Sequence, residues 1–213
     1  MNVLFVHGMG RSPMSGILLA RRLHRVGHRM HGVGYAVTFE DVAAVRDRIV
    51  DRITRLAAAG PYALIGHSLG GVLLRAALAR LPAELPLPHV LFLLGSPVQA
   101  VRPAMRLAHL RWYRLLTRES GQLLASPAAM ASLGTPPVRT IAIAGAGGWW
   151  PTAARVQRVR HDGVVTLDEI GSHWLDELHV VPVPHSFLPM SRHASDLVLA
   201  RLAELAHAPA LPD

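Results

Sequence analysis

Cysteine is absent from the 213 residues of the chain. Without thiols the chain has no disulfide framework, no thiolate metal ligand and no cysteine nucleophile. Lysine is absent as well, so arginine supplies the basic side chains behind a formal net charge of +8. This excess fits either the codon usage of an Ala/Arg-rich genome or attraction to anionic lipid or nucleic acid. Aromatic residues are only 5% of the chain, and few lie between the scattered arginines, so we expect no nucleic-acid partner.

Long hydrophobic runs are missing too. No apolar stretch approaches the roughly 18 residues that a membrane-spanning helix needs. Only Met1-Asn2 precedes the apolar run Val3–Val6, which leaves no room for the basic, apolar and small-residue regions of a secretion signal. Unless the chain is a mature form that has lost a leader, we expect a cytoplasmic protein. The oligomeric state is left open.

The apolar residues that are present, 51% of the chain, are enough for one domain with a sizeable core. Short apolar runs alternate with longer segments of helical spacing. The predicted strands are Val3–Val6, Arg29–Gly34, Tyr62–Ile65, Val90–Leu94, Val138–Ala144 and Val180–Val183. The predicted helices are Pro13–Val26, a segment with Thr38 as N-cap that ends at Gly60, Val72–Leu81 and His193–Ala206. This alternation predicts an α/β fold with a mostly parallel central sheet and helices on both faces. We expect a single domain over residues 1–207 and a flexible tail at 208–213.

The segment Gly66-His67-Ser68-Leu69-Gly70 lies between a predicted strand and a predicted helix. That setting is what the Gly-x-Ser-x-Gly nucleophile elbow requires, because the serine must sit on a sharp turn above the sheet. Glycines on both sides let the strand and helix backbones pass closely. Ser68 is therefore the candidate nucleophile, although a glycine-rich turn with an idle serine has the same sequence.

An oxyanion hole needs two backbone N–H groups, one from the residue after the nucleophile and one from a loop after an earlier strand. Leu69 and Met9, in His7-Gly8-Met9-Gly10, are the candidates. As candidate substrate-binding residues we take His7 and His67 beside these motifs, and Trp149 and Trp150 as a wall of an acyl pocket. For the two tryptophans, a plain packing role stays equally open.

The motif order predicts an acid and then a histidine after the serine. Asp162, in His161-Asp162-Gly163, is the favoured acid, and an Asp-Gly turn without a catalytic role is the alternative. His185 follows the last predicted strand at its carboxyl end and is the favoured general base. The competing acids and bases are Asp168, Asp176, Glu177, His173, His179 and His193.

These motifs, together with Leu94-Gly95-Ser96-Pro97, resemble small bacterial lipases and esterases of the α/β-hydrolase superfamily. The matches run from residue 3 to about residue 190, in the order of the family. The resemblance implies a minimal α/β-hydrolase fold and hydrolysis of carboxylic esters through an acyl-enzyme, with Ser68, Asp162 and His185 as the triad. It departs from the family where many relatives continue Gly-Thr-Pro-His-x-Gly-Ser after the strand that ends here at Leu94, which leaves the substrate preference open.

Residues 98–135 are longer than one crossover helix needs. Val101, Met105, Ala108, Trp112 and Leu115 follow helical spacing, and the arginines of the segment avoid this stripe. A basic amphipathic helix of this kind is either a lid that contacts a lipid surface or a crossover helix packed on the sheet with its arginines in water. We favour the crossover helix, with Trp112 in the core, because a short chain without an export signal has little reason to meet an oil–water interface.

The sequence thus predicts a serine hydrolase that cleaves carboxylic esters, with a small-molecule ester or lipid as substrate. Contact with a membrane surface is left open, and no cofactor or metal is implied. The alternatives are an amide or thioester hydrolase or an acyltransferase on the same triad, and a non-catalytic binding domain.

Overall fold

The computed structural model describes residues 1–147 and 160–207. Six parallel strands form one sheet in the order β2-β1-β3-β4-β5-β6. The strands are β1 (Asn2–Val6), β2 (Arg29–Val33), β3 (Tyr62–His67), β4 (Leu91–Leu94), β5 (Thr140–Gly145) and β6 (Glu177–Val181). The predicted fold class is confirmed, and each predicted strand is present with shifted ends.

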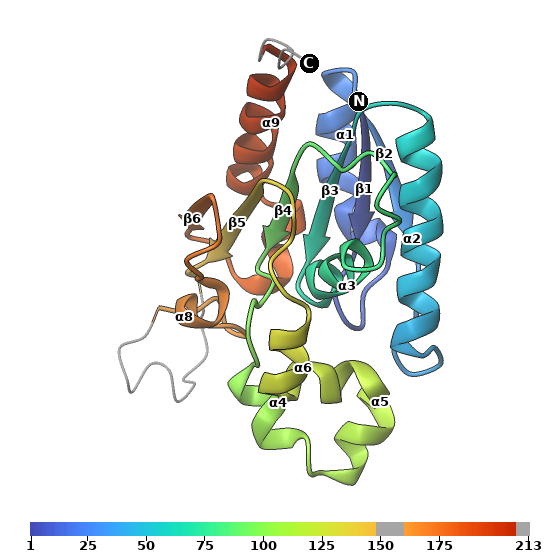
Figure 1. Cartoon of the computed structure of the whole chain (residues 1–213). Helices are drawn as coiled ribbons and strands as arrows, with labels where there is room; N and C mark the ends of the chain where they lie inside the picture. The colour runs from blue at the N-terminus through green and yellow to red at the C-terminus, as the bar shows by residue number, and fades with distance from the viewer. Residues whose placement is uncertain (148–159, 208–213) are drawn as a thin grey trace.

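The connecting segments are mostly helical. They are η1 (Pro13–Gly16), α1 (Ile17–Arg25), α2 (Val42–Ala58), α3 (Leu69–Leu78), α4 (Arg102–Leu107), α5 (Arg111–Ala125), α6 (Pro127–Ser132), α8 (Leu167–Ile170), η2 (His185–Met190) and α9 (Arg192–His207). Helices α2 and α3 cover one face of the sheet, whereas α1 and α9 cover the other (Figure 1). No helix among the described residues is long and apolar enough to cross a bilayer.

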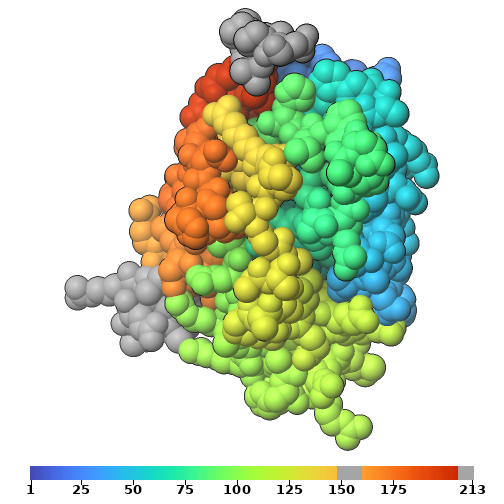
Figure 2. Space-filling model, in the orientation of Figure 1, coloured from blue at the N-terminus to red at the C-terminus, as the bar shows by residue number. Residues whose placement is uncertain are grey.

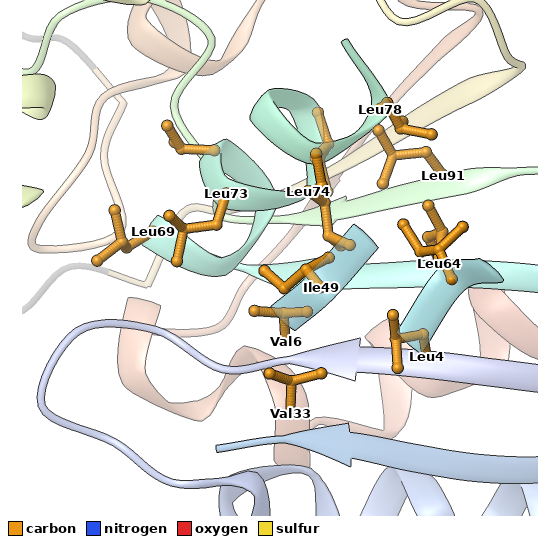
Figure 3. Close-up of a cluster of buried hydrophobic side chains, with 14 of the residues drawn as sticks. Leu4, Val6, Val33, Ile49, Leu64, Leu69, Leu73, Leu74, Leu78 and Leu91 are labelled. Atoms are coloured by element: carbon orange, nitrogen blue, oxygen red, sulfur yellow. The ribbon is translucent and has the colours of Figure 1, made fainter. Parts of the chain in front are cut away.

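Alternate residues of each strand point to opposite faces, and the core is therefore divided in two. On one face, Leu4 and Leu64 pack against Ile49 of α2 and Leu73 of α3 (Figure 3). On the other, residues of β1 and β4 pack against Leu19 of α1 and Val198 of α9. The strands, buried on both sides, are consequently almost continuously apolar, as parallel sheets require.

Helix α2 begins differently from the prediction. Asp41, not Thr38, is the N-cap residue. The Thr38 hydroxyl instead donates a hydrogen bond to the carbonyl of Leu116, 2.8 Å away. The first N–H group of the helix, that of Val42, donates to a carboxylate oxygen of Glu119 at 2.9 Å. A carboxylate 77 residues away thus occupies the positive end of the helix dipole, which no local capping pattern predicts.

The last strand also begins earlier than predicted, because β6 covers Glu177–Val181. Pro182 has no N–H group to donate to the sheet ladder, and the strand ends directly before it. His179 therefore lies in the middle of the strand, not at its start. His185 still follows the carboxyl end of the sheet, now by four residues.

Residues 98–135, called the cap segment below, form three helices instead of the single predicted helix. Leu110 has an extended backbone that separates α4 from α5. Helices α4, α5 and α6 lie beyond the carboxyl ends of the strands, away from the N-terminus and from the end of α9 (Figure 1). Trp112 and Leu115 are 54% and 75% exposed, so the prediction that this stripe packs on the sheet is wrong. A mobile lid remains a prediction.

Candidate active site

Ser68 occupies the turn between β3 and α3. Its backbone has φ 53° and ψ −124°, a left-handed conformation that a residue with a side chain adopts only under strain. Every residue from Tyr62 to Leu78 is buried except Ser68, which is partly exposed. The turn therefore presents one hydroxyl group at the carboxyl edge of the sheet.

Glycines make this turn sterically feasible. A Cβ atom on Gly66 would lie 2.3 Å from the Cα of Gly71, and one on Gly70 would lie 2.1 Å from the carbonyl oxygen of Val6. Both distances are far below van der Waals contact, so no larger residue fits without moving the backbone. The start of α3 is thereby pressed against both β3 and the end of β1.

Ser96 braces the turn from β4. Its hydroxyl group is within hydrogen-bond distance of the carbonyl oxygens of Ser68, at 2.8 Å, and Gly66, at 3.2 Å. The residue is fully buried. The sequence motif Gly95-Ser96-Pro97 marked this place, but nothing in the pattern indicated that the hydroxyl reaches the neighbouring turn.

Asp162 and His185 come together at the same edge of the sheet. The distance between Asp162 Oδ2 and His185 Nδ1 is 2.6 Å, and both residues are buried. The other carboxylate oxygen accepts hydrogen bonds from the backbone N–H groups of Val164 and Val165. Because a carboxylate can only accept, Nδ1 of His185 is the donor in this pair, and in a neutral ring Nε2 is the nitrogen with the lone pair.

The competing acids and bases have other partners or positions. Asp168 pairs with Arg102, and Asp176 accepts a hydrogen bond from the Thr140 N–H group. Glu177 contacts His179 and two arginines, Arg139 directly before β5 and Arg201 of α9. The remaining competitors, His173 and His193, are exposed. Of these candidates, the structure joins only Asp162 and His185 as an acid–histidine pair beside the elbow.

His67 lies beside this pair and is almost completely buried. Its Nε2 donates to the backbone carbonyl of His185 at 3.0 Å, and the two rings are 5.1 Å apart. Its Nδ1 has no hydrogen-bond partner among the described residues. Burial, reinforced by the neighbouring His185, lowers the pKa of His67 to about 3, so the ring is neutral.

His7 is buried too, at the end of β1. Its ring stacks on Tyr35 at 4.2 Å, Nδ1 donates to the Gly8 carbonyl, and Nε2 accepts from the Tyr35 N–H group. Burial lowers the pKa of His7. Both ring nitrogens are therefore engaged in holding the loop that follows β1.

Met9 and Leu69 flank the elbow on two different segments. Met9 lies in the loop after β1, and Leu69 is the first residue of α3. The two segments are in contact, because a Cβ atom on Gly8 would lie only 3.0 Å from the Cβ of Ser68. The backbone N–H group of Leu69 is one of the unpaired donors at the first turn of a helix.

A pocket of about 300 Å³ opens beside the acid–histidine pair. It is lined by Asp162, Gly163, Val164, Pro184, His185, Ser186 and Phe187. Trp149 and Trp150, the predicted acyl-pocket wall, lie outside the described residues. Within residues 1–147 and 160–207, no group of three histidine or carboxylate side chains is placed to hold a metal ion.

A parallel sheet with helices on both faces, and a serine on a strained strand–helix turn, define an α/β-hydrolase fold. A family model for the thioesterase domain matches residues 18–135, more than half of the chain, and the chain belongs to this family. No curated protein matches it significantly.

Solved structures agree on the fold. The mature form of a Bacillus licheniformis lipase is 16% identical, with a TM-score of 0.68 over 96% of this chain and 91% of that chain. The thioesterase domain from the curacin biosynthetic pathway is also 16% identical, with a TM-score of 0.61 over 93% and 90% of the two chains. The RedJ thioesterase of the prodiginine pathway in Streptomyces coelicolor is 17% identical, with a TM-score of 0.55 over 96% and 89%.

Proposed function

We propose that the protein is a serine hydrolase that cleaves acyl thioesters, or carboxylic esters, through an acyl-enzyme on Ser68. The observation that carries the proposal is the meeting of three features at one sheet edge. Nucleophilic acyl transfer requires an activated nucleophile, a base and a group that orients the base. Here these are a strained, partly exposed serine, a histidine whose Nε2 can accept a proton, and a buried carboxylate.

In the proposed reaction, His185 Nε2 removes the proton of the Ser68 hydroxyl as the oxygen attacks the acyl carbon. Asp162 stabilises the imidazolium that forms, and the N–H groups of Met9 and Leu69 donate to the oxyanion. His185 then gives the proton to the departing thiol or alcohol, which leaves an acyl-Ser68. A water molecule, deprotonated by the same histidine, releases the acid and restores the serine.

The thioester is the first candidate substrate because the family of the chain is named for thioester cleavage. Ester hydrolysis, which the sequence motifs predict, is the second candidate, and its support is the fold shared with a lipase. Both reactions use the same acyl-enzyme and differ only in the leaving group.

For His7 and His67 we infer a positioning role in place of the substrate contact predicted from sequence. Both side chains are nearly inaccessible. Three of their four ring nitrogens are bound to backbone groups, and the fourth, His67 Nδ1, is buried. His67 holds the backbone of the base, whereas His7 holds the loop that carries Met9. The predicted contacts of Trp149 and Trp150 with an acyl chain stay predictions.

The test is labelling by a fluorophosphonate probe, followed by peptide mapping of the modified residue. We expect Ser68 to be labelled, and Ser68→Ala to abolish labelling and to lower kcat on the order of a millionfold. Ser12→Ala, which removes an exposed hydroxyl from the loop after β1, is the matched control. It should keep both the labelling of Ser68 and the wild-type kcat. Wild-type turnover in a folded Ser68→Ala variant would contradict the proposal.

A matched pair of substrates decides between the two leaving groups. An acyl thioester of N-acetylcysteamine and the corresponding oxygen ester present the same acyl chain. Because thioesters differ intrinsically in reactivity, each kcat/KM is divided by the rate constant for hydrolysis by hydroxide. A larger ratio for the thioester supports thioesterase activity, and a larger ratio for the oxygen ester shows the second candidate.

A further inference from the structure

The outer surface of the cap segment carries exposed apolar side chains next to arginines. We call this surface the interfacial patch; it consists of Phe39, Arg111, Trp112, Arg114, Leu115, Leu116 and Arg118. Phe39 is 81% exposed and Leu116 is 53% exposed. With Trp112 and Leu115, they make four exposed apolar side chains on this surface. Exposed apolar side chains that cluster in this way mark interaction sites more often than singly scattered ones do.

The first two turns of α5 are sorted into three faces. Tyr113 and Thr117 point inward and are buried. At 100° per residue, Trp112, Leu115 and Leu116 share an outward face. Arg111 and Arg114 form a stripe along one side of that face. An outward apolar face bordered by arginine is the pattern of a helix that lies in the surface of a bilayer.

A groove separates this helix from the loop before α2. Its volume is about 910 Å³, and its lining includes Phe39 and Leu115 together with Arg111, Arg114 and Arg118. Two nearby carboxylates are already engaged, since Glu119 accepts from the Val42 N–H group and Asp41 pairs with Arg118 at 3.4 Å. The described residues contain no ion pair for Arg111 or Arg114.

We propose that the interfacial patch docks the protein on an anionic lipid bilayer, with lipid phosphates beside Arg111 and Arg114 and with Trp112 and Leu115 among the acyl chains. The cap segment lies at one end of the molecule, away from the N-terminus and the end of α9, so a flat surface can approach it there (Figures 1 and 2). A bilayer accepts projecting apolar side chains without a complementary shape, which an acidic protein partner would have to supply. Docking does not depend on the reaction at Ser68 and is measured without substrate.

The experiment is co-sedimentation of the full chain with two kinds of vesicle. One is made of phosphatidylcholine alone, and the other contains one third phosphatidylglycerol. We expect binding to the anionic vesicles that weakens as salt is added. Equal binding to both kinds, or binding to neither by the folded protein, would overturn the proposal; the second result is the one expected if an acidic protein is the partner.

Two double variants separate the contributions of charge and apolar contact. An arginine near an anionic surface is worth roughly fivefold in binding. The double variant Arg111→Gln with Arg114→Gln should therefore lower the partition coefficient about 25-fold. Trp112→Ser with Leu115→Ser should lower it at least about tenfold, because less apolar surface leaves water on docking.

Matched controls lie elsewhere on the protein. Arg21→Gln with Arg25→Gln removes the same charge from a groove beside α9, and Val26→Ser removes a half-exposed apolar side chain at the end of α1. Both should bind anionic vesicles as the unaltered protein does. If the α1 variants lose binding and the α5 variants keep it, the docking surface has been placed on the wrong face. Melting temperatures of all variants exclude unfolding as the cause.

Discussion

At the scale of single residues, Gly95 is a tightly constrained backbone position beside both members of the acid–histidine pair. Its φ is +56°, and a Cβ atom there would lie 2.7 Å from Leu188 Cδ1, 3.1 Å from His185 Nδ1 and 3.3 Å from Asp162 Oδ2. A side chain at this position must therefore displace the groups on which the proposed reaction depends.

We predict that Gly95→Ala lowers kcat at least about a hundredfold, because an ångström-scale displacement of a reacting group has a cost of this order. Gly27→Ala is the control. Gly27 has a positive φ of 84° but nothing within 4 Å of an added Cβ, so its cost is limited to backbone strain, about 1–2 kcal/mol. Equal loss of activity in both variants would show that backbone strain alone lowers kcat, and that the contacts of Gly95 with the acid–histidine pair do not.

Ser96 offers a second prediction at this scale. Ser96→Ala removes the buried hydroxyl that donates to the Ser68 turn, and should lower stability by about 1–3 kcal/mol. The strained turn then relaxes, and fluorophosphonate labelling of Ser68 should slow. Ser195→Ala removes another buried hydroxyl, one in α9 that donates to the carbonyl of Ser191 directly before that helix. This variant should lose comparable stability and keep the labelling rate. Unchanged labelling of Ser96→Ala would contradict the bracing role.

At the scale of elements, Arg75 of α3 joins the two ends of the cap segment. Its guanidinium donates to the carbonyl oxygens of Val98, at 3.2 Å, and Gly134, at 2.9 Å, and lies 5.1 Å from the ring of Trp174. The side chain is buried, and burial lowers the pKa of Arg75 to about 10. It therefore remains protonated at neutral pH.

We predict that Arg75→Lys loosens the cap segment without unfolding the sheet, because an ammonium group lacks the planar fork that reaches both carbonyls. Hydrogen–deuterium exchange should accelerate in residues 98–135 and stay slow in β1 and β3. Arg80→Lys, at an exposed position after α3, is the matched control. If exchange rises equally across the whole chain, Arg75 supports the fold in general and not the cap segment.

The elements themselves were predictable to the extent that their signals are local. Strands such as Val3–Val6 are short apolar runs, and α2 shows its core stripe at every turn. The elbow glycines and Ser68 were found because their spacing reflects one sharp turn. Asp162 and His185 were nominated from their places after strands, and the structure brings them together; their catalytic roles remain predictions.

What could not be predicted depends on contacts between distant segments. Glu119 caps α2 from 77 residues away, and no local pattern in either segment predicts this contact. Ser96 and Arg75 act through backbone carbonyls, which any residue supplies. The stripe through Trp112 was misinterpreted because periodicity reports amphipathicity, and an outward apolar face has the same period as a buried one.

At the scale of the whole molecule, the sheet separates two cores. The proposed chemistry occupies the carboxyl edge of the sheet, at the junction between the strands and the loops that follow them. His7 and His67 belong to this junction, and both are held neutral by burial. In the unfolded chain, by contrast, a histidine has a pKa near 6.5. As the pH falls below about 6.5, these histidines bind protons in the unfolded chain but not in the native state, so acid destabilises the fold.

The last prediction follows from the size of this effect at His67. Its native pKa of about 3 means that its titration costs the fold nothing above about pH 6.5 and destabilises the fold progressively as the pH falls toward 3. Between pH 7 and pH 5 the loss amounts to about 2 kcal/mol. His67→Asn removes the titrating ring, and although it lowers stability at both pH values, the difference between them should shrink by about that amount. Urea unfolding at the two pH values measures the difference, and His173→Asn, at an exposed position, controls for the removal of a histidine as such. If wild type and His67→Asn lose the same stability on acidification, the acid sensitivity arises elsewhere, and His67 is not the neutral buried group that the junction requires.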